Sequence, residues 1–145
     1  MHVRTPIKVR YGETDMMGVV YHANYLLYFE DARIDFLSTV GASYAAIEDA
    51  GYMSPIHDID VTYGTPLRYG EDAFVLTRVV RSTPTKTTYA QDVYRADMDP
   101  TTDKPLVAAH VTCCIVERAT FKPVSIKRTF PELYALYQEI IEPEA

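Results

Sequence analysis

The stretch that decides the fold is YLLYFEDARIDFLSTV, residues 25–40. At about 100° per residue, one helical face carries apolar side chains, namely Tyr25, Tyr28, Phe29, Ala32, Phe36 and Val40. The opposite face carries polar ones, namely Glu30, Asp31, Asp35 and Ser38. Leu26 and Leu37 widen the apolar side, Asn24 precedes the stretch as a cap, and Gly41 follows it as a stop. The pattern predicts a long helix over 25–40, buried around most of its perimeter.

Strand patterns surround this helix. Residues 3–10 form a weak strand that Pro6 places at an edge or a start, and HDIDVTY, residues 57–63, alternates apolar and polar side chains. Two long β-rich runs, 73–83 and 86–96, meet at a tight turn near Thr83-Pro84-Thr85, and 106–118 is expected to be the fifth and longest strand.

Two shorter helices complete the predicted elements. Residues 43–50 form a short helix closed by Gly51. Thr129 and Glu132 fit a capping box for a terminal helix, whose apolar positions are Leu133, Leu136, Tyr137 and Ile140.

The order of these elements defines the fold class. Strands joined directly in series must be antiparallel neighbours, because parallel strands need long crossovers. A helix of 16 residues is ~24 Å long, about the span of a seven-residue strand. We therefore expect one α+β domain over residues 1–145, with a five-stranded antiparallel sheet curled around one long helix and a C-terminal helix added.

Composition excludes several classes of protein. The 145 residues are 48% hydrophobic and 23% charged, which is typical of a globular domain. No run approaches the ~18 apolar residues of a membrane span, and MHVRTPIKVR lacks the apolar region of a secretory signal, so we expect a cytoplasmic protein. The net charge of −6 disfavours non-specific nucleic-acid binding. The two cysteines, Cys113 and Cys114, form no disulfide framework or metal-ligand set.

The loop before the long helix carries the residues suited to chemistry. Asp15 lies between Gly12 and Gly18, in a loop that leads into the start of the helix. The first backbone N–H groups of a helix have no partner within it and carry the positive end of its dipole. A carbonyl oxygen held there is polarised, and a carboxylate beside it can act as a base or a nucleophile.

The segment RYGETDMMGVVYHANYLLYFEDAR, residues 10–33, resembles the signature of the hot-dog acyl-CoA thioesterases. The most similar group is the 4-hydroxybenzoyl-CoA thioesterase family, including the short-chain acyl-CoA thioesterases of the Tol-Pal gene cluster. VTYGTPLRYGED, residues 61–72, is similar to the second recurring segment of that family. The resemblance implies a hot-dog fold and hydrolysis of an acyl-CoA to a free acid and CoA. It also implies that no metal or cofactor is needed, because CoA is part of the substrate.

The resemblance also implies roles for single residues. Asp15 matches the catalytic carboxylate, acting either as general base or as nucleophile through a mixed anhydride. His22 matches the second active-site residue, whose backbone N–H contacts the oxyanion. Tyr11 and Tyr21 are expected to line the site, and Gly18 would let the substrate approach the backbone closely.

A basic cluster is needed for the phosphates of CoA. The candidates are Lys122, Lys127 and Arg128, with Lys86 and Arg68 as weaker ones. A solvated protein edge explains the first three equally well. His57 and His110 lie in strands without ligand spacing and are interpreted as packing or interface residues.

Several alternative functions stay open from the sequence. One is hydrolysis of an acyl group carried by acyl carrier protein, and another is a non-catalytic acyl-CoA-binding module. A hot-dog hydratase is disfavoured, because six residues separate Asp15 from His22 and those enzymes use a shorter spacing. Bulky residues at 26–29 favour short or aromatic acyl groups. In the resembled family the strand matching 57–63 pairs with its symmetry mate, so we expect a homodimer or a tetramer of two such dimers.

Overall fold

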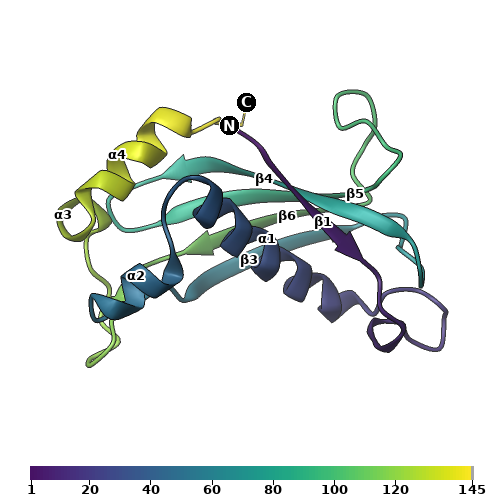
Figure 1. Ribbon diagram of the computed structural model, residues 1–145, viewed down its shortest axis with the longest axis horizontal. Coiled ribbons are helices and arrows are strands. Elements are labelled where there is room, and N and C mark those ends of the chain that lie inside the picture. Colours follow the sequence, from purple (N-terminus) through teal and green to yellow (C-terminus); the bar gives the residue numbers. More distant parts are fainter. Residues whose placement is uncertain (145) are drawn as a thin grey trace.

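The computed structural model describes residues 1–144 and contains a curled five-stranded antiparallel sheet with one long helix across it (Figure 1). The strand order is β1-β4-β5-β6-β3. The sheet strands are β1 (Val3–Lys8), β3 (Ile56–Tyr63), β4 (Asp72–Ser82), β5 (Thr87–Arg95) and β6 (Val107–Cys113). A second, two-stranded sheet pairs β2 (Tyr52–Met53) with β7 (Val116–Glu117). The predicted α+β class and five-stranded antiparallel sheet are confirmed.

The helical segments lie between β1 and β2 and after β7. They are the short 3-10 turns η1 (Tyr11–Glu13) and η2 (His22–Asn24), and the helices α1 (Tyr25–Thr39), α2 (Tyr44–Asp49), α3 (Ile126–Thr129) and α4 (Pro131–Ile140). Within residues 1–144, none of these helices has the length and apolar character needed to span a bilayer.

Helix α1 supplies the centre of the core, as its periodicity predicts. Phe29, Ala32 and Phe36 are at most 2% exposed, and the ring of Phe36 packs edge-on to that of Tyr89 in β5. The expectation of burial around most of the perimeter is wrong for the single chain. Leu26 and Ile34 remain 41% and 46% exposed, because they point away from the sheet. The helix therefore leaves an apolar strip uncovered.

The predicted fifth strand is shorter than expected. β6 ends at Cys113 and the chain resumes as β7, so β4, with 11 residues, is the longest strand. The physical reason is a change of partner. The backbone N–H of Cys114 donates to the carbonyl of Pro55, and Ile115 turns into a separate small core with Ile47 and Ile126.

The predicted capping box does not form. The side chain of Ser125 instead caps α3 by accepting the N–H of Arg128, and Pro131 occupies the first turn of α4. Proline suits that position because its missing N–H would have had no partner there. The apolar spacing still places Tyr137 of α4 in the core, where its hydroxyl bonds that of Tyr89 at 2.6 Å.

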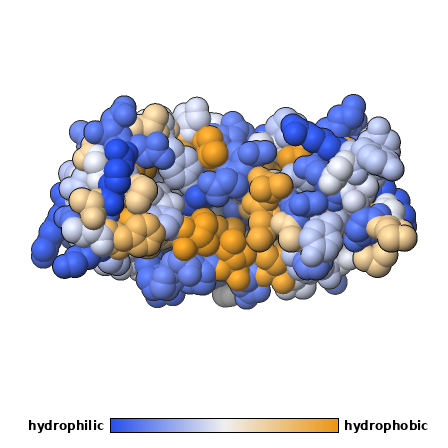
Figure 2. Space-filling view, turned by 90° about the horizontal axis from the view of Figure 1, so that it is seen from below, coloured by the Kyte–Doolittle hydropathy of each residue, from blue (hydrophilic) through white to orange (hydrophobic). Residues whose placement is uncertain are grey.

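The two edges of the sheet differ in character. β1, with Pro6, is one edge as predicted, and β3 is the other, with almost every residue exposed. Gly64 donates its N–H to the carbonyl of Leu106, so alternation along the ladder turns the N–H groups of Val61 and Tyr63 outward from the sheet. Seen from below, apolar surface gathers along the middle of the molecule (Figure 2). The exposed apolar and aromatic side chains of β3 are Ile56, Ile59 and Tyr63.

A buried guanidinium links α1 to β6. The side chain of Arg33 is 4% exposed, bonds Glu30 at 3.0 Å and contacts the sulfur of Cys113. Burial raises the pKa of Cys113 to about 11, although the neighbouring Arg33 acts in the opposite direction.

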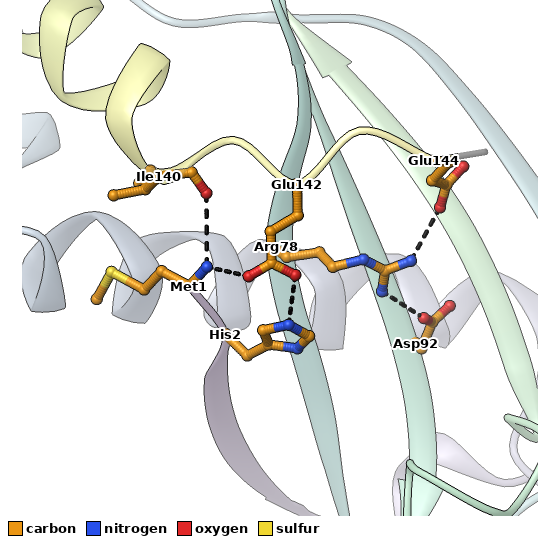
Figure 3. A network of polar contacts seen from close by, with 7 residues as sticks. All are labelled: Met1, His2, Arg78, Asp92, Ile140, Glu142 and Glu144. Carbon is orange, nitrogen blue, oxygen red and sulfur yellow. Dashed lines mark hydrogen bonds and ion pairs between the residues drawn. The ribbon is translucent and has the colours of Figure 1, made fainter.

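The C-terminal segment crosses the sheet and joins the N-terminus in a network of polar contacts (Figure 3). Glu142 donates its backbone N–H to the carbonyl of Val79, and its carboxylate pairs with the terminal ammonium of Met1. Arg78 of β4 bonds both Asp92 and Glu144 at 2.9 Å. The two ends of the chain are thereby fixed next to each other.

Candidate active site

The loop before α1 folds back on itself and presents Asp15. The N–H of Asp15 donates to the carbonyl of Val19 at 3.0 Å, and the N–H of Gly18 donates to the carbonyl of Asp15 at 3.0 Å. Gly18 has φ +77°, a left-handed conformation that favours glycine. The glycine therefore closes the turn that holds Asp15.

The carboxylate of Asp15 is half-buried and partly committed to the backbone. Its Oδ1 accepts the N–H of Met17 at 2.8 Å, which fixes the rotamer. Within residues 1–144, its Oδ2 accepts no hydrogen bond from the protein. One oxygen is thus free to meet water or a substrate.

The turn that opens α1 exposes backbone donors. The N–H of Asn24 donates to the carbonyl of Tyr21 at 2.8 Å. Because a peptide group is planar and trans, the N–H of His22 points opposite to that carbonyl, away from the helix. The N–H groups of His22 and Ala23 have no acceptor in the described part of the chain. Asn24 holds the N-cap position, but its side chain donates to the carbonyl of Glu13 and so anchors the loop instead.

Asp15 and His22 both line one hollow of about 170 Å³. Its lining combines one carboxylate with apolar and aromatic side chains: Asp15, Met17, Val19, Val20, His22, Tyr25, Tyr63, Gly64, Pro66 and Val107. The predicted pair Asp15 and His22 is therefore brought together. A carboxylate near a helix N-terminus, beside apolar walls, suits attack on a polarised carbonyl.

Asp15 and His22 are the only lining residues that the sequence predicted as site residues, and two of the missed ones are the tyrosines Tyr25 and Tyr63. The hydroxyl of Tyr63 donates to the carbonyl of His22 at 2.9 Å, and its ring lies 5.7 Å from that of Tyr25. The hydroxyl of Tyr25 accepts the N–H of Leu67, and burial raises its pKa. The sequence feature that could have indicated Tyr63 is its position inside the 61–72 segment. Its alternation with Val61 predicts a strand but no role in the site.

The predicted wall residues lie differently. Tyr21 packs against His22, with ring centroids 4.4 Å apart, at the border of the hollow. Tyr11 lies outside it and packs edge-on to Tyr69 at 5.6 Å, beside a separate groove between β1 and α1.

The candidate phosphate contacts are not near Asp15 within one chain. Lys86 lies in the turn between β4 and β5 and bonds the ring of His57 at 2.8 Å, while Lys127 and Arg128 belong to α3. Lys122 follows β7. These segments lie at the end of the sheet opposite the loop that carries Asp15 (Figure 1). Of the predicted candidates, Arg68 lies beside the loop, since its Nη1 is 3.8 Å from the place of a Cβ at Gly18.

The site and the fold define the class of protein. Residues 9–135 match the model of the thioesterase-like superfamily. The chain belongs to this superfamily, and the predictions of a hot-dog fold and of a thioesterase are confirmed at that level.

Individual relatives agree with the family. YneP of Bacillus subtilis, provisionally named an acyl-CoA thioesterase, is 37% identical over 96% of this chain and 98% of its own length. The acyl-CoA thioesterase YbgC of Helicobacter pylori is 30% identical over 87% of this chain and 95% of its own. The crystal structure of a DHNA-CoA thioesterase from Staphylococcus aureus superposes with TM-score 0.89 at 32% identity, covering 96% of this chain and 90% of that one.

Proposed function

We propose that the protein is an acyl-CoA thioesterase that hydrolyses an acyl-CoA to a free carboxylic acid and CoA. The observation that carries the proposal is the joint placement of the Asp15 carboxylate and the unpartnered N–H of His22 at one hollow. The names of the relatives from B. subtilis and H. pylori support the same substrate class.

The proposed chemistry needs one base and one oxyanion site. Asp15 either takes a proton from the attacking water or attacks the thioester carbonyl itself, forming a mixed anhydride that water then cleaves. In both routes the C–S bond breaks and CoA leaves as a thiolate that takes up a proton. The N–H of His22 stabilises the oxyanion, together with the neighbouring unpartnered N–H of Ala23 and the positive end of the α1 dipole.

The proposed reaction uses no metal and no cofactor, since a carboxylate, water and backbone donors suffice for thioester hydrolysis. CoA enters only as part of the substrate. A cytoplasmic location, where acyl-CoA is made and used, remains part of the proposal.

For the acyl group, we propose a short or aromatic chain. The hollow is small, and the rings of Tyr25, Tyr63 and His22 line it. An aromatic ring packs favourably against such rings. The S. aureus relative is named for an aromatic acyl-CoA. Within the family we propose to place the chain with the short-chain thioesterases of the Tol-Pal gene cluster. The reason is that residues 10–33 resemble the signature of the family that includes this group.

We propose that the active unit is at least a homodimer, formed by antiparallel pairing of β3 with its own copy. The outward N–H groups of β3 and the exposed Ile56 and Ile59 support this edge. A two-fold axis through the middle of β3 exchanges its ends, so the Lys86 end of one protomer meets the Asp15 end of the other. Lys86, Lys122, Lys127 and Arg128 would then approach the phosphates of CoA from the partner. Two such dimers would form the proposed tetramer.

The test is turnover of an acyl-CoA panel from acetyl to palmitoyl, with benzoyl-CoA and 4-hydroxybenzoyl-CoA, followed by release of free thiol. We expect turnover, with short or aromatic substrates preferred. Acyl carrier protein loaded with the same acyl groups tests the alternative donor. Tight binding of acyl-CoA without thiol release would indicate a binding module and refute the enzyme.

A further inference from the structure

Tyr63 is the last residue of β3, and its side chain reaches across the hollow to the turn that opens α1. Its hydroxyl donates to the carbonyl of His22 at 2.9 Å, and its ring stands edge-on to the His22 ring at 6.2 Å. We propose that Tyr63 is a positioning residue, which holds the peptide groups around His22 in the orientation that the oxyanion needs. Because the reaction proposed above supplies the oxyanion, the role of Tyr63 rests on that proposed function.

The hydrogen bond controls the direction of a backbone donor. In a planar trans peptide the carbonyl of His22 and the N–H of Ala23 point in opposite directions. Fixing the carbonyl with Tyr63 therefore fixes the N–H of Ala23. The preceding peptide group is fixed separately, because the carbonyl of Tyr21 accepts the N–H of Asn24. The N–H groups of His22 and Ala23 are thus both oriented by hydrogen bonds to the carbonyl of their own peptide group.

Tyr63 itself is placed by rigid elements. Its Cα pairs with Val107 of β6, and the next residue, Gly64, donates its N–H to the carbonyl of Leu106 at 2.8 Å. A Cβ at Gly64 would lie 2.8 Å from that same oxygen, so a larger residue would push the strand end away. The tyrosine ring also packs against Tyr25. Because the sheet holds Tyr63 in place, Tyr63 can hold the turn at the start of α1 in a fixed position.

The hydroxyl of Tyr63 is not needed for the core, because the residue is 45% exposed. Its removal in Tyr63→Phe keeps the ring and its packing. Displacement of a reacting geometry by about 1 Å costs up to ~10²-fold in rate. We expect kcat to fall about 10- to 100-fold while KM stays within about threefold.

The experiment compares wild type, Tyr63→Phe and the control Tyr94→Phe with the best substrate of the panel. Tyr94 loses the same hydroxyl, but it stacks on Phe74 on the sheet face away from α1, so its kcat should match wild type. Amide ¹H–¹⁵N spectra give a second readout that does not depend on turnover. The resonances of His22 and Ala23 should shift in Tyr63→Phe and stay in place in Tyr94→Phe.

Each outcome decides the role of Tyr63. Lower kcat with unchanged KM, unchanged melting temperature and shifted amides supports positioning. If wild type is active and Tyr63→Phe has the same kcat, the positioning role of Tyr63 is overturned but the proposed function is not. A rise in KM without loss of kcat overturns it in favour of substrate binding. A wild type that hydrolyses no thioester overturns the proposed function itself, and the catalytic role of Tyr63 with it.

Discussion

The carboxylate of Asp15 accepts one backbone N–H through Oδ1 and lines the hollow beside the turn that opens α1. Asp15→Asn keeps its shape and removes its basicity and nucleophilicity. We expect kcat to fall by about three orders of magnitude or more, with the fold intact. Steady-state turnover by thiol release measures this, with Asp97→Asn in an exposed turn as the control. Retention of roughly a tenth of wild-type turnover would contradict a chemical role, because acid–base catalysis alone contributes more.

His22 offers a backbone donor that a side-chain substitution leaves in place. His22→Ala removes the imidazole and keeps the N–H, whose own loss would cost ~10²–10³ in rate. We therefore expect His22→Ala to lose less activity than Asp15→Asn. The same assay checks this, with His110→Ala on the other sheet face as the control. Equal losses would give the imidazole itself a chemical role.

For single residues, the sequence predicts Asp15 and His22 in the loop before α1 better than it predicts the other residues that line the hollow. Asp15 and His22 lie seven positions apart within one recognisable segment, and the hollow brings them together. Tyr63 is 41 positions from His22, and its alternation with Val61 indicates only a strand face. Strand alternation contains no information on which distant backbone carbonyl a hydroxyl reaches. The basic candidates fail to cluster near Asp15 for the same reason, since position along the chain does not tell which end of the sheet they occupy.

The strand β3 is the element on which assembly is predicted to depend. The N–H of Val61 points outward from the sheet, so Val61→Pro removes a donor to a neighbouring chain and leaves the pairing with β6 intact. We expect wild type to have at least twice the chain mass of 16.4 kDa and Val61→Pro to be a folded, inactive monomer.

Light scattering coupled to size exclusion measures these masses. Val61→Thr, which keeps the N–H and the β-branched shape, is the matched control and should retain the wild-type mass. A wild-type monomer of 16.4 kDa with full activity would refute the shared site, and an oligomeric Val61→Pro would exclude β3 as the interface.

Among the elements, periodicity predicts α1 well because one face of it is buried against the sheet. It fails for 106–118, where apolar residues on both sides of Cys114 conceal the point at which the chain leaves the main sheet. It also fails at the last helix. There Thr129 and Glu132 fit a capping box, but Pro131 and Ser125 determine the actual starts.

For the molecule as a whole, the buried phenols and the buried thiol determine how stability depends on alkaline pH. Burial raises the pKa of Tyr137 from 10.0 to about 12 and that of Cys113 from 9.0 to about 11, and it also raises the pKa of Tyr89. The folded state therefore binds these protons more tightly than the unfolded state does. Their contribution to stability is complete below about pH 9 and is lost as pH rises toward 12.

We expect the melting temperature to be flat from pH 7 to 9 and to fall steeply above pH 10, as followed by circular dichroism. Tyr137→Phe removes one of these groups, so its decline should be shallower. A melting temperature that holds or rises up to pH 11 would contradict the assignment.

The adjacent cysteines differ sharply in solvent exposure. The reactivity of the buried one can therefore be used to measure local opening of the structure. Cys113 is 4% exposed beside Arg33, whereas Cys114 is half-buried outside the main sheet. Cys113 lies among residues of α1 and of the C-terminal helices, namely Leu37, Ile126, Leu133 and Tyr137. A thiol reagent reaches it only when these helices separate from the sheet, because the side chain is buried. In Cys114→Ser, the ratio of its labelling rate to that of an unfolded thiol therefore measures the free energy of that separation. The thiol of Cys113 is therefore an internal probe of how often the helices that cover it separate from the sheet.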